Sequence, residues 1–112
     1  MLKKVYFNFR GKNLKIVAKL CSFFSLGLIL KTRNTMPCIF EFKRPTSFKI
    51  SSLFVFFPFV AVWLDGKNKV IEIKKVRPFT FSIGLKKPFY KIIEIPINPK
   101  YKNKVKVLLP RR

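Results

Sequence analysis

The chain has 112 residues, the size of one small domain, so we expect a single domain spanning residues 1–112. It contains 25 Lys and Arg against 4 Asp and Glu, with a formal net charge of +21, and it has no histidine. The absence of imidazole excludes a Ser-His-Asp triad and a His-ligated metal, and we expect neither a metal nor another cofactor.

The N-terminal half contains short apolar runs separated by turn residues. Residues 5–9 and 14–18 flank a glycine-containing turn and predict a β-hairpin. Residues 22–28 predict a short helix that begins with a serine cap. Residues 38–42 alternate between apolar and polar side chains and predict a strand that stops before Pro45.

The strongest strand signal lies in the middle of the chain. Residues 52–57 and 59–64 are nearly all apolar, which predicts a strand that is covered on both faces at the centre of the fold. Pro58 has no N–H to donate and marks an interruption between the two runs. Residues 65–68 have the sequence Asp-Gly-Lys-Asn, which predicts a tight turn, and residues 70–73 return as the partner strand of a hairpin.

Prolines punctuate the remainder of the chain. Arg77-Pro78 ends the hairpin, residues 79–83 are expected to be extended, and residues 90–95 predict a further strand. Lysines at every second position of residues 100–107 predict an amphipathic strand. The predicted fold class is mainly β (β-rich α+β): a compact single-domain sheet or barrel-like fold with at most one or two short helices.

Cysteine usage and apolar run length bear on the cellular environment. Cys21 and Cys38 lack CxxC spacing and lie beside apolar residues, so we expect two buried, reduced thiols, with a disulfide as the alternative. The uncharged stretches 20–30 and 50–64 are shorter than the roughly 20 residues that a membrane-spanning helix needs. The sequence therefore predicts no transmembrane segment and a cytoplasmic protein.

The candidates for acid–base catalysis are few. Asp65 begins a turn, where an aspartate commonly caps backbone N–H groups. Glu94 lies in an otherwise apolar strand, where we expect a lysine to neutralise it. A hydrolase-like enzyme would require these two carboxylates to lie about 5–10 Å apart and to face a common cleft.

The positive charge allows two interpretations. It is spread evenly along a chain rich in Lys, Phe, Ile and Asn, which is typical of the codon bias of an A/T-rich genome. Alternatively, the charge binds nucleic acid or another anionic partner without sequence specificity. In that case the C-terminal stretch is the expected site, and its candidate residues are Lys100, Tyr101, Lys102, Lys104, Lys106, Arg111 and Arg112.

The central segment, residues 52–71 (SLFVFFPFVAVWLDGKNKVI), resembles the domain of unknown function 192 family, a group of small microbial proteins. The family motif is an apolar-aromatic strand, a Pro, a second strand that ends in Leu-Asp, then a turn and Val-Val or Val-Ile. Residues 39–42, 76–79 and 90–96 resemble further family segments in the right order, and the resemblance covers about residues 14–108. It implies a compact β-rich fold and no established biochemical activity.

This chain departs from the family pattern at several polar positions. Ser51 stands where the family commonly has His, Val60 where it often has Asp, and Leu26 where it has Arg. Because half of any polar site is thereby lost, we expect a non-enzymatic protein with a structural or binding role. Nucleic-acid binding is the alternative, and an enzyme using Asp65 and Glu94 is the third hypothesis.

Overall fold

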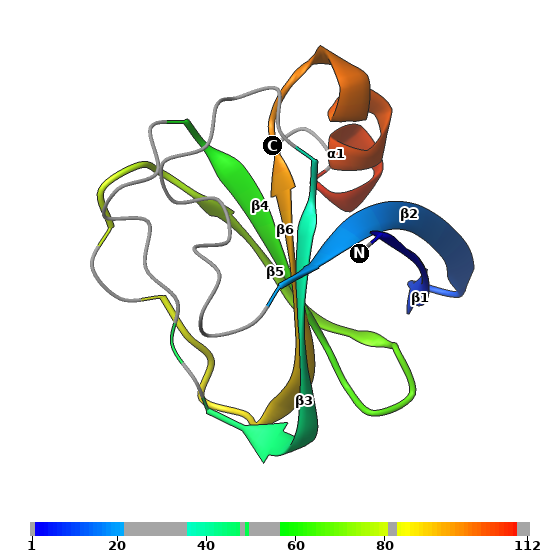
Figure 1. Ribbon diagram of the computed structural model, residues 1–112, viewed down its shortest axis with the longest axis vertical. Coiled ribbons are helices and arrows are strands. Elements are labelled where there is room, and N and C mark those ends of the chain that lie inside the picture. The colour runs from blue at the N-terminus through cyan, green and yellow to red at the C-terminus, as the bar shows by residue number, and fades with distance from the viewer. Residues whose placement is uncertain (1, 22–35, 48, 50–56, 81–82, 110–112) are drawn as a thin grey trace.

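The computed structural model describes residues 2–21, 36–47, 49, 57–80 and 83–109, which form one curled six-stranded sheet with a short C-terminal helix (Figure 1). The strand order is β1-β2-β3-β6-β4-β5, and all neighbours are antiparallel except β2 and β3. The elements are β1 (Leu2–Phe9), β2 (Lys12–Cys21), β3 (Cys38–Thr46), β4 (Phe59–Leu64), β5 (Val70–Val76), β6 (Phe89–Pro96), a 3-10 turn (Pro99–Tyr101) and α1 (Lys102–Leu108). The predicted mainly β, barrel-like fold with a short helix is confirmed.

Two hairpins supply four of the six strands, as the turn residues predict. The β1–β2 turn places Arg10 at φ 53° and Gly11 at φ 80°, the left-handed pair that matches the twist of a two-residue hairpin loop. The β4–β5 turn begins at Asp65, whose N–H donates to Lys69 O at 2.9 Å. Both predicted hairpins are confirmed.

Strand β6 lies between β3 and β4 and joins the two halves of the sheet. Its Ile93 pairs with Ile39 of β3 on one side and with Val62 of β4 on the other. All six residues of β4 are buried, so the predicted two-sided burial of residues 59–64 is confirmed.

The sheet has a separate apolar cluster on each face. One cluster includes Phe59, Trp63, Phe89 and Ile92. On the other face the β1–β2 hairpin curls over the sheet, and α1 adds Leu108 to this second cluster. The two clusters explain why central strands carry apolar side chains at consecutive positions rather than at alternate ones.

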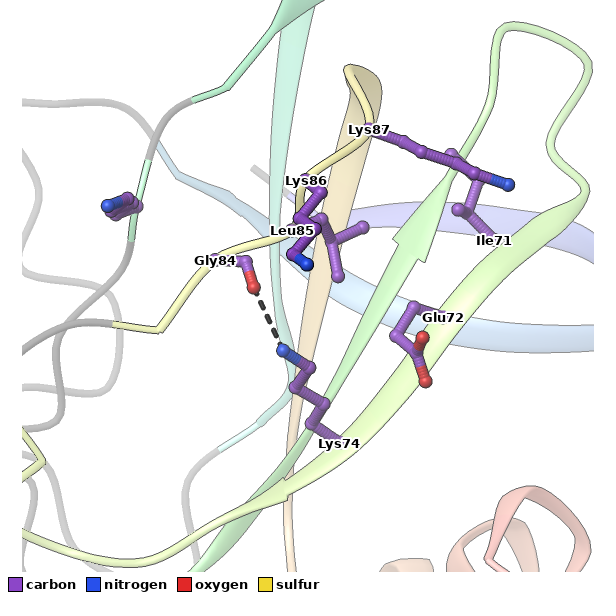
Figure 2. A pocket seen from close by; sticks show the side chains of 8 residues that line it. Ile71, Glu72, Lys74, Gly84, Leu85, Lys86 and Lys87 are labelled. Atoms are coloured by element: carbon purple, nitrogen blue, oxygen red, sulfur yellow. Dashed lines mark hydrogen bonds between the residues drawn. The ribbon is translucent and has the colours of Figure 1, made fainter.

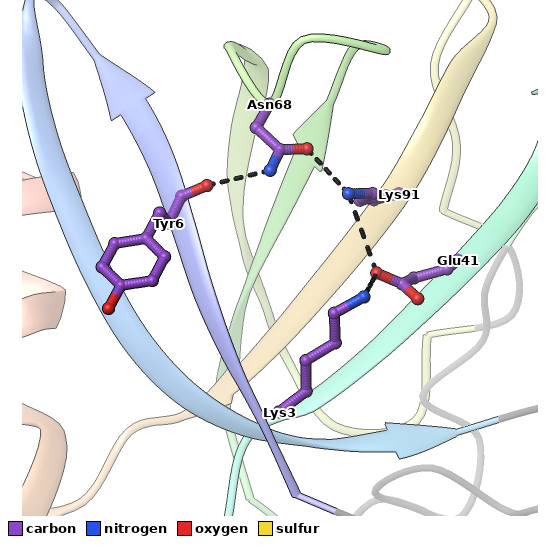
Figure 3. A network of polar contacts seen from close by, with 5 residues as sticks. All are labelled: Lys3, Tyr6, Glu41, Asn68 and Lys91. Carbon is purple, nitrogen blue, oxygen red and sulfur yellow. Dashed lines mark hydrogen bonds and ion pairs between the residues drawn. The ribbon is translucent and has the colours of Figure 1, made fainter.

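A polar network links the end of β1 to the β4–β5 turn and to the middle of the sheet (Figure 3). Asn8 N–H donates to Asn68 O at 2.9 Å, and Asn68 Nδ2 donates to the carbonyl oxygen of Tyr6 at 2.9 Å. Lys91 donates to Asn68 Oδ1 at 2.8 Å and also lies 3.7 Å from Glu41, which is paired with a lysine of β1. The network therefore draws the two edges of the curled sheet together.

Two sequence predictions for the strands and loops differ from the structure, and two others fall mainly outside the described residues. Strand β3 continues through Pro45, because its register with β6 shifts between Glu41 and Thr46 and a bulged stretch tolerates a residue without N–H. Phe79 is not extended but lies in a turn at φ 62°. The helix predicted over residues 22–28 and most of the run 52–57 lie outside the described residues.

Candidate functional site

The two candidate catalytic carboxylates lie far apart. Ala61 of β4 pairs with Glu94 of β6, and Asp65 lies four residues further along, which corresponds to about 13 Å of strand. Asp65 Oδ1 accepts hydrogen bonds from the N–H groups of Lys67 at 2.8 Å and Lys69 at 2.9 Å, so it serves the turn. This placement does not meet the requirement for a catalytic pair.

Glu94 is a buried carboxyl group, 5% exposed, in a row across the sheet between Cys38 and Ala61. Burial raises the pKa of Glu94 to about 8, and the neighbouring Cys21 adds to the shift, so the group is mainly protonated at neutral pH. The predicted lysine partner is wrong within the described residues, where the ion pairs are formed by Glu41. Lys91 lies three residues from Glu94 on the same strand, so its side chain points to the opposite face of the sheet and cannot pair with Glu94.

Cys21 and Cys38 lie beside Glu94 as buried, unbridged thiols, as the sequence predicts. Cys21 Sγ donates to Lys19 O at 3.6 Å. The pKa of Cys38 is raised above its usual range, chiefly by a hydrogen bond between the two thiols and to a lesser extent by burial. A Cys38 thiol that stays protonated is a poor nucleophile and a poor metal ligand, and the burial of both cysteines favours a packing role.

The predicted basic C-terminal strand is wrong, because residues 99–108 are helical. The N-cap Asn98 accepts a hydrogen bond from Tyr101 N–H, and Tyr101 and Val105 pack against the second cluster. The four lysines therefore do not share one strand face. Lys102 and Lys106, one helical turn apart, line a small pocket, whereas Lys100 lies over the Tyr101 ring. Arg111 and Arg112 lie outside the described residues.

A lysine-rich pocket of about 530 Å³ opens between β5 and the loop that precedes β6 (Figure 2). Four lysines and one glutamate line it, which gives a formal charge of +3. Its lining residues are Lys49, Ile71, Glu72, Lys74, Gly84, Leu85, Lys86 and Lys87. We call this site the lysine pocket.

Gly84 fixes the geometry of the lysine pocket. Lys74 Nζ donates to Gly84 O at 2.9 Å, which holds the half-buried lysine at the rim. A Cβ atom on residue 84 would lie 2.8 Å from Lys49 Cγ, so only glycine lets the Lys49 stem cross at this point. The Lys74 ammonium also lies 5.6 Å from the centroid of the buried Trp63 ring, which favours the cation.

The lysine pocket combines a concave shape with charge of one sign. Such clefts concentrate the field and attract anions more strongly than scattered surface lysines do. The side chains of Ile71 and Leu85 add an apolar wall. Its lysines come from three segments, residues 49, 74 and 86–87. Because lysines are spread along the whole chain, no short stretch of the sequence distinguishes these four from the others.

Comparisons with known proteins support the fold and leave the function open. No family model and no curated protein matches the chain. A crystal structure of a protein of unknown function from Novosphingobium aromaticivorans is similar, with a TM-score of 0.74 and 14% sequence identity, over 91% of this chain and 77% of that chain. At this identity the likeness concerns the fold alone. Among the described residues, no helix has the length and apolar character to cross a membrane.

Proposed function

We propose that the protein is a non-enzymatic binding protein for a small, multiply charged anion, held in the lysine pocket. The observation that carries the proposal is that four lysines and a single carboxylate line one pocket of about 530 Å³. Pockets of this size are typical of small-molecule sites.

The contacts around Gly84 support binding rather than catalysis. Lys74 is positioned by its hydrogen bond to Gly84 O, so part of the binding geometry exists before the ligand arrives. The carboxylates considered as catalysts are used elsewhere, Asp65 in a turn and Glu94 in the core. Multiply charged anions such as polyphosphates and tricarboxylates fit the charge of the pocket best.

The test is isothermal titration calorimetry with inorganic pyrophosphate, and with citrate as a tricarboxylate probe. Trp63 is the single tryptophan and lies beneath Lys74, so its emission provides a second readout. We expect Lys74→Gln to weaken binding by about tenfold or more, because a charge-assisted contact is lost while a neutral donor to Gly84 O remains.

Lys75→Gln is the matched control. Lys75 is exposed, lies next to Lys74 on β5, and points to the opposite face of the sheet. Each variant replaces one lysine by glutamine, so the two variants have the same net charge. We expect Lys75→Gln to bind like the parent. Absence of binding of either probe by the parent protein, or equal losses in the two variants, would contradict the proposal.

Membership of the domain of unknown function 192 family remains a separate proposal. The segment that carries the resemblance includes β4, whose residues are all buried, the turn at Asp65 and the start of β5. A family of related sequences that retained Gly84 and the four lysines would support both proposals together.

A further inference from the structure

The β1–β2 hairpin has one face in the second apolar cluster and one face toward solvent. The cross-strand pairs Val5–Ile16 and Phe7–Leu14 belong to the buried face. Side chains alternate along strands, so the opposite face carries the remaining pairs. We call it the hairpin face, and it consists of Leu2, Lys4, Tyr6, Asn8, Asn13, Lys15, Val17 and Lys19.

The hairpin face is basic and has an exposed aromatic side chain at its centre. Tyr6 is 59% exposed, and it pairs across the strands with Lys15. Lys4 lies two residues away on the same strand, which places it about 7 Å from Tyr6. The chain has no acidic residue before Glu41, so no carboxylate of the hairpin neutralises this face.

We propose that the hairpin face binds single-stranded nucleic acid, whose bases stack on Tyr6 and whose phosphates contact the three lysines. A basic surface with an aromatic stacking platform is the arrangement that single-strand binding requires. The proposal is independent of the lysine pocket, with which the hairpin face shares no residue.

Protection of a sheet edge against aggregation explains this face less well. Lysines on an edge strand commonly prevent pairing with another chain, and β1 is an edge strand. Lys19, however, lies on the part of β2 that pairs with both β1 and β3, whereas Lys15 pairs with β1 alone. The place of Lys19 between two paired strands, together with the exposed Tyr6 ring opposite Lys15, favours a ligand that covers the face.

The backbone of the hairpin is held in place, so the platform is formed in advance. Asn68 Nδ2 donates to the carbonyl oxygen of Tyr6, while the Tyr6 ring points away from this network (Figure 3). The left-handed turn at Arg10 and Gly11 fixes the register of the two strands. Substitution of the exposed Tyr6 ring therefore leaves the fold intact, which makes it a clean test.

The experiment is fluorescence anisotropy of a labelled oligo(dT) 12-mer and of the same sequence as a duplex with oligo(dA). We expect Tyr6→Leu to weaken single-strand binding by at least about fivefold, the loss that corresponds to about 1 kcal/mol of stacking. Tyr6→Phe should bind like the parent, since stacking needs the ring and not the hydroxyl group. Three phosphate contacts predict an affinity about 20-fold lower at 200 mM than at 50 mM NaCl.

A matched pair of lysine variants separates the hairpin face from the overall charge. Lys15→Gln should reduce the slope of log K against log salt by about 0.7, whereas Lys43→Gln should leave it unchanged. Lys43 is an exposed lysine on the part of β3 that does not pair with β2. Lack of binding at 50 mM NaCl would overturn the proposal, as would tighter binding of the duplex, equal effects of the two lysine variants, or binding restricted to anionic phosphatidylglycerol vesicles.

Discussion

At the scale of single residues, Glu94 shows how this chain tolerates a carboxyl group in its core. The group is buried opposite Ala61 and Cys38, forms no ion pair with any described residue, and has a pKa that burial raises to about 8. Sequence reasoning identified Glu94 as unusual but expected a lysine beside it, because 19 lysines make a partner statistically available. Strand register decides toward which face of the sheet a lysine side chain points, and register cannot be predicted from composition.

The buried carboxyl group predicts a specific dependence of stability on pH. Its pKa is raised from 4.5 to about 8 in the folded state, so the folded state holds the proton more tightly than the unfolded state does. The contribution of Glu94 is therefore fully present below pH 4.5 and is lost as the pH rises toward about 8, a change on the order of 5 kcal/mol.

Glu94→Gln tests this directly in urea unfolding curves between pH 5 and 9. The amide cannot ionise, so we expect the variant to be more stable than the parent at pH 9 and to lose this part of the pH dependence. A parent protein whose stability increases between pH 5 and 8 while the variant stays flat would show that the carboxyl group is charged and paired.

At the scale of elements, turn residues predicted the secondary structure most reliably, and the alternation of lysines predicted it least reliably. The hairpin at Asp65 was predictable because Asp-Gly at the end of an apolar run allows few alternatives. The C-terminal helix was missed although Asn98 and Pro99 form a typical N-terminal cap. Tyr101, Val105 and Leu108 also repeat at helical spacing, and the period of the apolar residues rather than that of the lysines decides the structure.

The β4–β5 turn predicts the effect of removing its carboxylate. Asp65→Ala loses two backbone hydrogen bonds, from Lys67 and Lys69, and we expect it to lower the free energy of unfolding by about 1–2 kcal/mol. Asp65→Asn keeps an acceptor oxygen and should lose less. Urea unfolding of both variants measures the difference. Equal stability of Asp65→Ala and the parent would mean that water satisfies these N–H groups equally well.

At the scale of the whole molecule, the sheet is held in its curl by contacts between residues distant in sequence. The strands could be predicted from the chain, but the closure could not, since nothing local indicates that Asn68 meets Tyr6 and Lys91. The lysine pocket has the same origin, as its lysines lie on three separate segments. Local patterns predict elements, whereas sites depend on how the elements are brought together.

Asn68→Gly tests the closure. Asn68 has φ 62°, a value that glycine adopts freely, so the variant removes the side chain without straining the turn. We expect it to lower the free energy of unfolding by about 1–2 kcal/mol and to accelerate hydrogen exchange at the Asn8 amide, which donates to Asn68 O. Unchanged exchange at Asn8 would show that the strand edges stay together without the side chain.

The central place of β6 constrains the order in which the molecule can form. Before residues 89–96 have been synthesised, β3 and β4 have no common neighbour, and each presents an unpaired edge. The hairpins can form early, but the sheet cannot be joined until its last strand inserts between two partners that lie far upstream in the chain. A nascent or truncated chain that ends before Phe89 therefore exposes the edges of β3 and β4 and is an aggregation hazard.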